Sequence, residues 1–140
     1  MRTVLDDIFG SSSTTLYATD ANIDYVLGEA DIVTCATMST EPVLRGEWLR
    51  AGQHVDLIGA YRPDMREADD TAITRARVFV DSFDTTVGHI GEIKIPLETG
   101  IITRDALIAD YYQPQAFRRG SDDEITLFKN GGGAHLDLMT

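Results

Sequence analysis

Two short loops carry the residue types in this 140-residue chain that are best suited to holding a small ligand. Thr37 and Ser39 place hydroxyl groups in the first loop, and Gly59 and Ala60 place two small residues in the second. Each loop follows a short apolar run, and ligands of open parallel sheets bind at the carboxyl ends of the strands. Because small residues let a flat ligand approach the backbone, the pattern predicts either a ligand site formed by both loops or two tight turns.

The elements that position these loops follow the rhythm of a parallel sheet covered by helices. Apolar runs at residues 32–37, 55–59 and 78–81 are typical of buried strands and alternate with helix-like stretches. No strand leading into a Gly-rich turn precedes them, which is the pattern of the back half of a nucleotide-binding fold without its phosphate-binding front half. The expected fold class is α/β: the back half of a Rossmann-type parallel sheet, flanked by helices, with a C-terminal strand–helix tail. The other expected elements are helices at 3–9, 21–29, 47–50, 67–75, 85–93, 104–111 and from about 134, and strands at 15–18 and 125–128.

Charge and cysteine content exclude several classes of function. With 12 basic and 23 acidic residues the net charge is −11, so binding to nucleic acid or to an anionic membrane surface is disfavoured. The single cysteine, Cys35, allows no internal disulfide and lies in an apolar run, where a thiol packs as a small hydrophobic group. His54, His89 and His135 stand too far apart to suggest a metal site. No segment has the length of a membrane span or the pattern of a secretory signal, which predicts a soluble cytoplasmic protein of one domain.

Six short motifs follow one another along the chain. They are ADIVTCAT (30–37), EPVL (41–44), GAYRPDMRE (59–67), ARVFVD (76–81), GEI (91–93) and DEITLFK (123–129). In order and spacing they resemble the ornithine cyclodeaminase/mu-crystallin family over about residues 20–138, nearly the whole chain. Each motif alone is weak, but jointly they are specific.

The resemblance implies a homodimeric, nicotinamide-dependent enzyme with a Rossmann-type domain and a separate dimerising substrate domain. Members of the family cyclise ornithine to proline, reduce cyclic ketimines with NAD(P)H, or act on related amino acids. Residues 1–95 then correspond to a truncated Rossmann-like remnant, and residues 96–140 to a tail resembling part of the substrate and dimerisation domain. The positions implied to bind NAD(P) are Ala36, Thr37, Ser39, Gly59, Ala60, Lys129 and Asn130.

The resemblance covers only part of a family member, which is more than twice as long. The unmatched part of such a protein carries the Gly-x-Gly turn that places the pyrophosphate on a helix N-terminus. We therefore expect this chain alone to bind NAD(P) poorly or not at all.

Two residues depart from the family pattern or allow two interpretations. Tyr61 stands where ornithine cyclodeaminases have an aspartate, and a phenol cannot replace a carboxylate as general base at neutral pH. This favours the ketimine reductase branch, in which hydride delivery and a proton donor suffice. Tyr61 is thus the candidate catalytic residue, lining the nicotinamide pocket, with a partly buried packing aromatic as the alternative. Lys129 either meets a phosphate or a substrate carboxylate or, as the simpler expectation, is a solvated surface lysine.

A sheet without its front strands exposes an unpaired apolar edge, and such edges attract partners. We expect a homodimer or higher oligomer that covers this edge, or an N-terminal segment (residues 3–9 or 15–18) that fills it. Three functions stay open: a truncated cyclic ketimine reductase that is inactive alone, a non-enzymatic interaction or scaffold protein, and half of an ornithine cyclodeaminase-like enzyme completed by a separate N-terminal part.

Overall fold

The computed structural model describes residues 23–132. The chain divides into two compact units, residues 1–30 and 31–140. In the first unit, helix α2 (Ile23–Glu29) buries Val26 and Leu27, two members of the apolar stripe that predicts this helix. The elements expected at residues 3–9 and 15–18, and the helix expected from about 134, lie outside the described residues.

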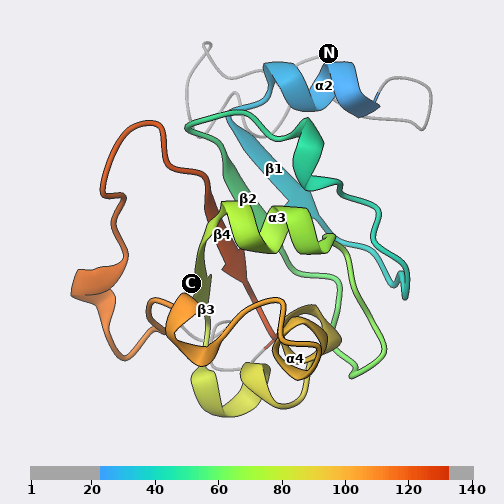
Figure 1. The fold of residues 1–140 in the computed structure, drawn as a ribbon, viewed down its shortest axis with the longest axis vertical. Helices are drawn as coiled ribbons and strands as arrows, with labels where there is room; N and C mark the ends of the chain where they lie inside the picture. Colours follow the sequence, from blue (N-terminus) through green and yellow to red (C-terminus); the bar gives the residue numbers. More distant parts are fainter. Residues whose placement is uncertain (1–22, 133–140) are drawn as a thin grey trace. The chain divides into compact units, whose positions relative to one another are not determined.

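A sheet of four parallel strands forms the centre of the second unit (Figure 1). Its strands are β1 (Ile32–Cys35), β2 (His54–Leu57), β3 (Arg77–Val80) and β4 (Thr126–Lys129). Their order in space is β1-β2-β4-β3, so the strand that comes last in the sequence lies between β2 and β3. The α/β fold class and the three apolar runs predicted as strands are confirmed.

The register of the sheet aligns the ends of all four strands. Cys35 pairs with Leu57, Leu57 pairs with Lys129, and Lys129 pairs with Val80. Because the strands are parallel and end level with one another, the four loops that follow them leave from the same end of the sheet. We call this end the carboxyl edge, as distinct from the two side edges of the sheet at β1 and β3. This carboxyl edge points toward the end of the unit where α4 lies (Figure 1).

Side chains alternate between the two faces of the sheet. One face is fully packed, and its buried residues include Val55, Leu57, Val78, Val80 and Leu127. The other face is less evenly covered. Phe79 of β3 is buried, whereas Ile32 of β1 is 66% exposed.

Two helices complete the second unit. Helix α3 (Asp70–Arg75) is capped by Asp69, whose carboxylate accepts hydrogen bonds from Ala72 N and Gly46 N at 2.8 and 2.9 Å. It packs against β3 and against η1 (Gly46–Trp48), a single 3-10 turn. Helix α4 (Gly91–Glu98) follows η2 (Phe83–Val87), a π-helical turn that it contacts.

Several predicted helix boundaries are wrong. The helix expected at 85–93 is instead the turn η2 followed by α4, with Gly88 between them. The helix expected at 67–75 begins only at Asp70, because Asp69 caps it and residues 67–68 belong to a buried loop. The helix expected at 104–111 is reduced to one 3-10 turn, η3 (Arg104–Ala106).

The segment after η3 is extended because it pairs with β3. Ile108 N donates to Val78 O at 2.9 Å, and Val80 N donates to Ala109 O at 3.1 Å. Leu107 and Ala109 are buried by this pairing, and the backbone bonds outweigh the local helix propensity of the sequence. One edge of the sheet is thereby covered, whereas no strand within residues 23–132 pairs with the outer side of β1.

Candidate functional site

The loops that follow the strands meet at the carboxyl edge of the sheet. Ile58 N donates to Cys35 O at 2.9 Å, and Asn130 N donates to Leu57 O at 3.0 Å. These bonds continue the β1–β2 and β2–β4 pairing by one residue, so the loops start side by side. The edge carries all positions predicted to bind a cofactor, namely Ala36, Thr37, Ser39, Gly59, Ala60, Lys129 and Asn130. Their role in binding stays a prediction.

A buried carboxylate joins the two loops that the sequence singles out. Glu67 Oε1 accepts hydrogen bonds from Thr37 N at 2.6 Å and from Thr37 Oγ1 at 2.9 Å. Its Oε2 accepts from Gly59 N at 2.8 Å and from Ala60 N at 3.2 Å. Four donors from two neighbouring strand ends thus converge on one side chain, which no solvent reaches. We call this group, Glu67 with Thr37, Gly59 and Ala60, the Glu67 clasp.

Gly59 lies where the two loops touch. A Cβ atom at this position would lie 2.0 Å from Thr37 O, 2.2 Å from Thr37 N and 2.5 Å from Glu67 Oε1. No side chain fits such a space without displacing backbone. The missing side chain therefore serves the contact between the loops, a reason that the sequence pattern does not reveal.

A second buried carboxylate holds the backbone of the clasp. Glu92, in the first turn of α4, accepts from Glu67 N at 2.7 Å and from Ala68 N at 3.0 Å. Burial raises the pKa of Glu92, and its two backbone hydrogen bonds oppose that rise. Helix α4 thereby fixes the peptide from which the Glu67 side chain reaches the strand ends.

Lys129 is fully buried, so the expectation of a solvated surface lysine is wrong. It ends the central strand β4 and points into the packed side of the sheet, where its Nζ donates to Leu57 O at 2.9 Å. Burial lowers the pKa of its ammonium group, while the charges of Glu92, Glu67 and Asp81 act in the opposite direction. Within the described residues, this ammonium group thus binds the backbone at the end of β2 from the buried side of the sheet.

A third carboxylate organises the loops after β3 and β4. Asp81 Oδ1 accepts from Ser82 N at 2.8 Å and from the hydroxyl of Thr86, and its Oδ2 accepts from Gly131 N at 2.9 Å. Asn130 Oδ1 in turn accepts from Gly132 N at 2.8 Å. The turn that begins at Asn130 is therefore tied to the end of β3.

The predicted site residues differ in their accessibility. Tyr61, the candidate catalytic residue, follows the clasp directly and is 53% exposed. Ala36 is exposed, and Thr37, Ser39 and Gly59 are partly exposed. Ala60 is fully buried against Met65 and Ile90, so its methyl group packs inside the unit.

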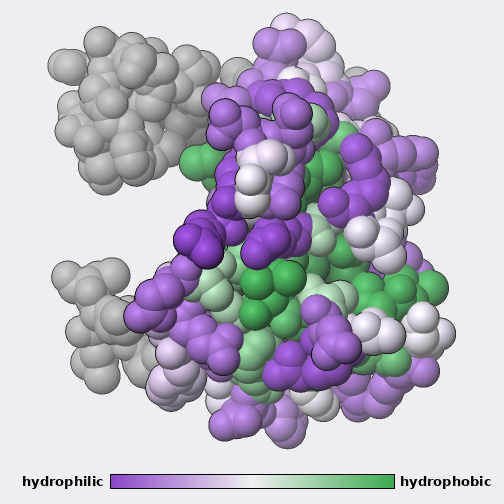
Figure 2. All heavy atoms as spheres, turned by 60° about the vertical axis from the view of Figure 1, so that its left-hand side comes forward, coloured by the Kyte–Doolittle hydropathy of each residue, from purple (hydrophilic) through white to green (hydrophobic). Residues whose placement is uncertain are grey.

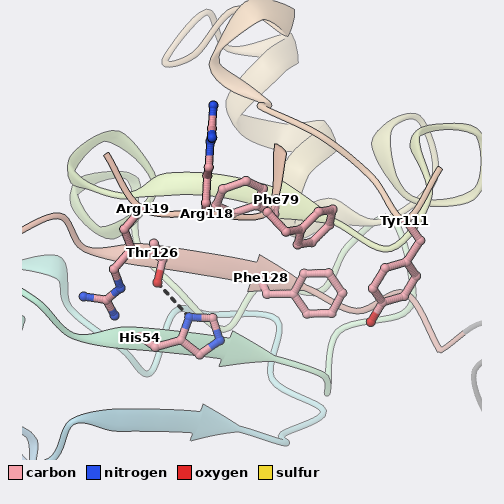
Figure 3. Close-up of a pocket in the computed structure, with 8 residues that line it drawn as sticks. His54, Phe79, Tyr111, Arg118, Arg119, Thr126 and Phe128 are labelled. Atoms are coloured by element: carbon pink, nitrogen blue, oxygen red, sulfur yellow. Dashed lines mark hydrogen bonds between the residues drawn. The ribbon is translucent and has the colours of Figure 1, made fainter. Parts of the chain in front are cut away.

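A separate cleft of about 410 Å³ lies on one face of the sheet. Figure 3 shows Phe79, Phe128 and Tyr111 gathered along this face and Arg118 pointing away from the strands. Phe117 stacks on Phe79 with ring centroids 4.9 Å apart. Figure 2, in which the side of residues 104–124 comes forward, shows hydrophobic residues bordered by hydrophilic ones. None of the predicted cofactor positions lines this cleft.

The polar end of the cleft contains His54. Its Nδ1 lies 2.8 Å from Thr126 Oγ1 on the neighbouring strand (Figure 3). Burial lowers the pKa of His54, which favours the neutral imidazole. On the same face, Asp56 has a raised pKa because it is buried, and its Oδ1 has no hydrogen-bond partner within the described residues.

The described residues also bear on the cysteine, on metal ligands and on membrane-spanning helices. Burial, reinforced by the charges of Glu67 and Glu92, raises the pKa of the Cys35 thiol to about 12, so it stays protonated and unreactive at neutral pH. Within residues 23–132, no three His, Cys, Asp or Glu side chains are grouped to hold a metal ion. No helix there has the length and apolarity needed to cross a membrane.

Glu67 and Glu92 are residues of the candidate site that were not predicted from the sequence, although both lie in the six motifs. Glu67 ends GAYRPDMRE, and Glu92 is the centre of GEI. Only Glu92 had a local signal, because Ile90 and Ile93 flank it in the sequence, and a charged residue within an apolar run needs partners. Glu67 stands among polar residues such as Arg66 and Asp69, and no such signal marks it.

Comparison with known proteins places these features in a family. The pattern of the ornithine cyclodeaminase/mu-crystallin family matches residues 16–140. Delta(1)-pyrroline-2-carboxylate reductase of Paracoccus denitrificans is 56% identical over 122 residues, which are 85% of this chain and 39% of that protein.

Solved structures agree with this assignment. Thermococcus litoralis Delta(1)-pyrroline-2-carboxylate reductase, in complex with NADH and L-proline, has a TM-score of 0.73 and 32% identity over 79% of this chain and 35% of its own. An archaeal alanine dehydrogenase dimer with bound NAD has a TM-score of 0.70 and 32% identity over 77% and 34%. The chain thus spans about two fifths of the length of the relatives that it matches. With its parallel sheet, its loop pair and these similarities, the chain belongs to the ornithine cyclodeaminase/mu-crystallin family.

Proposed function

We propose that this chain supplies the nicotinamide-facing part of an NAD(P)H-dependent cyclic imine reductase and does not complete the cofactor site alone. The observation that carries the proposal is the Glu67 clasp, which joins two loops at the carboxyl edge of a parallel sheet, where such folds bind nucleotides. The 56% identity to a pyrroline-2-carboxylate reductase supports the choice of substrate class.

The residues at this edge fit a flat, uncharged ring better than a pyrophosphate. Ala36 is exposed, and Thr37 and Gly59 offer partly exposed, uncharged surface. The backbone N–H groups of Thr37, Gly59 and Ala60, which could hold a phosphate, already donate to Glu67. We therefore infer that this chain contacts the nicotinamide end and that a segment outside it holds the phosphates.

In this assignment the cofactor supplies a hydride to the carbon of a C=N bond, and a proton completes the amine. Tyr61 is the exposed hydroxyl nearest in sequence to the clasp, and we assign it to the wall of the nicotinamide pocket. A cyclic imine that carries a carboxylate, such as Δ1-pyrroline-2-carboxylate, is the proposed substrate class. A cytoplasmic location stays a prediction of the sequence.

The outer edge of β1 is the proposed place where another segment completes the sheet. Asp31 O and Cys35 O accept from β2, so the backbone groups of Ile32 and Thr34, which alternate with them, face the free side. Nothing within residues 23–132 pairs with these groups. We propose that a further strand pairs there, contributed by a separate N-terminal part or by a second copy of the chain.

A titration with NADH and NADPH, followed by nicotinamide fluorescence, tests the first claim. The 140-residue chain alone should show no saturation at millimolar cofactor. Saturation in the micromolar range would contradict the claim that the site is incomplete, while supporting a reductase. This result would direct attention to a self-associated form.

A chimera tests the substrate class. The chain replaces the matching part of the Paracoccus denitrificans reductase, and NAD(P)H oxidation is followed with Δ1-pyrroline-2-carboxylate. Turnover supports the proposal. A folded chimera that binds no cofactor would instead favour the second candidate function, a non-enzymatic interaction protein that associates through the free edge of β1.

A further inference from the structure

We propose that Glu67 is a positioning residue for the nicotinamide ring, because its carboxylate sets the separation of the two loops on which the ring rests. This inference depends on the proposed function, since it concerns the same site. Glu67 has no exposed surface, so it acts through the loops and not by touching a ligand.

Each of the two carboxylate oxygens of Glu67 accepts hydrogen bonds from a different loop. Oε1 receives both bonds from Thr37, which follows β1, and Oε2 receives the bonds from Gly59 and Ala60, which follow β2. A carboxylate can accept on both oxygens, whereas a glutamine amide turns one side into a donor. Only an acidic residue can therefore hold both loops at once.

The backbone that carries this side chain is itself fixed. Val43 N and Leu44 N donate to Glu67 O at 2.9 and 2.8 Å. Glu67 N donates to Glu92 Oε2 at 2.7 Å. The backbone at Glu67 is thus held by α4 and by the loop before η1. When the side chain is replaced, this backbone therefore cannot move toward the two loops to compensate.

The geometry also explains why the loop separation matters for a ring-shaped ligand. The loops touch at Gly59 and Thr37, leaving no room between them, so a ligand has to lie on their outer surface. A flat ring that contacts both loops needs the two contact surfaces to lie in one plane. A displacement of one of them by about 1 Å misplaces the ring and lowers the reaction rate strongly.

Amide hydrogen exchange on the 140-residue chain tests the clasp directly. In Glu67→Gln the amide NH2 group faces one of the two loops, and the backbone amides of that loop lose their acceptor. Either Thr37, after β1, or Gly59 and Ala60, after β2, should therefore lose about tenfold to hundredfold protection. Core amides of β2 and β4 should keep theirs. Glu98→Gln makes the same chemical change at an exposed position of α4 and should alter none of these amides. Unchanged protection at Thr37, Gly59 and Ala60 in Glu67→Gln would overturn the clasp.

The chimera described above tests the positioning role. Glu67→Gln should raise the NADH dissociation constant about tenfold or more and leave the KM for the imine nearly unchanged. A purely structural role would instead lower thermal stability without this split. Equal NADH affinity in the chimera and in its Glu67→Gln variant would overturn the inference while leaving the reductase function intact.

Two further outcomes are informative. If Glu67→Gln does not fold, Thr37→Val removes the hydroxyl bond to Oε1, together with the longer bond of 3.4 Å that this hydroxyl accepts from Ser39 N, and should give a smaller effect in the same direction. If the unsubstituted chimera binds no NADH, the proposed function fails and the positioning role fails with it. The exchange data then still report on whether the clasp exists.

Discussion

At the scale of single residues, the buried charges of this chain serve its own backbone. Glu67 joins the loops after β1 and β2, and Asp81 joins those after β3 and β4. Lys129 donates to the end of β2. Charged residues near a candidate site are easily taken for catalytic groups, but here their hydrogen bonds hold the backbone at the ends of the strands.

The stability of the chain should depend on pH through Lys129. Burial lowers its pKa in the folded state, so between that lowered pKa and 10.5 the folded chain binds fewer protons than the unfolded chain. Stability contributed by this group therefore rises with pH across the window. Lys129→Met should remove this rise, as measured by urea unfolding at a series of alkaline pH values. Parallel curves for the two proteins would contradict the burial of a charged ammonium group.

At mildly acidic pH the stability of the chain should depend on His54. Its pKa is lowered by burial from 6.5, so protonation below that value favours the unfolded state, and stability falls as pH drops through the folded pKa. His54→Gln can keep a hydrogen bond to Thr126 and should flatten this fall. His89→Gln, at an exposed position, should retain it. Thermal unfolding between about pH 7 and pH 5 distinguishes the variants.

At the scale of elements, the contact between the two site loops should tolerate no added methyl group. Gly59→Ala places a Cβ 2.0 Å from Thr37 O and should destabilise the chain by about 1–3 kcal/mol. Gly88→Ala has nothing within 4 Å of the new atom and should change stability by less than about 0.5 kcal/mol. Chemical denaturation measures both. A neutral Gly59→Ala would show that the loops separate easily.

The strands could be predicted from the sequence because each is a short apolar run of buried residues. The structure of the segment 104–111 could not, because its extended part around Ile108 depends on bonds to Val78 and Val80, about 30 residues earlier in the sequence. The site was predictable only in part: the sequence indicates which loops meet, since parallel strands share an edge. Glu67 was missed because the bonds that define it reach back 30 residues to Thr37.

At the scale of the whole second unit, the two edges of the sheet differ. The outer side of β3 is covered by the extended segment around Ile108. Within the described residues the outer side of β1 has no strand partner, and Ile32 of this strand is 66% exposed. The asymmetry favours association on one side only.

This edge should control self-association. Ile32→Lys places a charge on β1 itself and should weaken any concentration-dependent dimer, since charged side chains protect edge strands. Thr71→Lys adds the same charge at an exposed position of α3 and should leave the association unchanged. Sedimentation velocity over a range of concentrations gives the measurement. Equal weakening by both substitutions would point to net charge and not to the edge.

The place of β4 has a consequence for how the chain acquires its structure on the ribosome. His54 and Thr126 are neighbours in the sheet although 72 positions separate them, and β2 and β3 touch only through β4. Until residues 126–129 have been synthesised, the earlier strands cannot form a continuous sheet. Folding of this unit therefore has to wait until β4 has been synthesised, and pairing between residues 72 positions apart slows it.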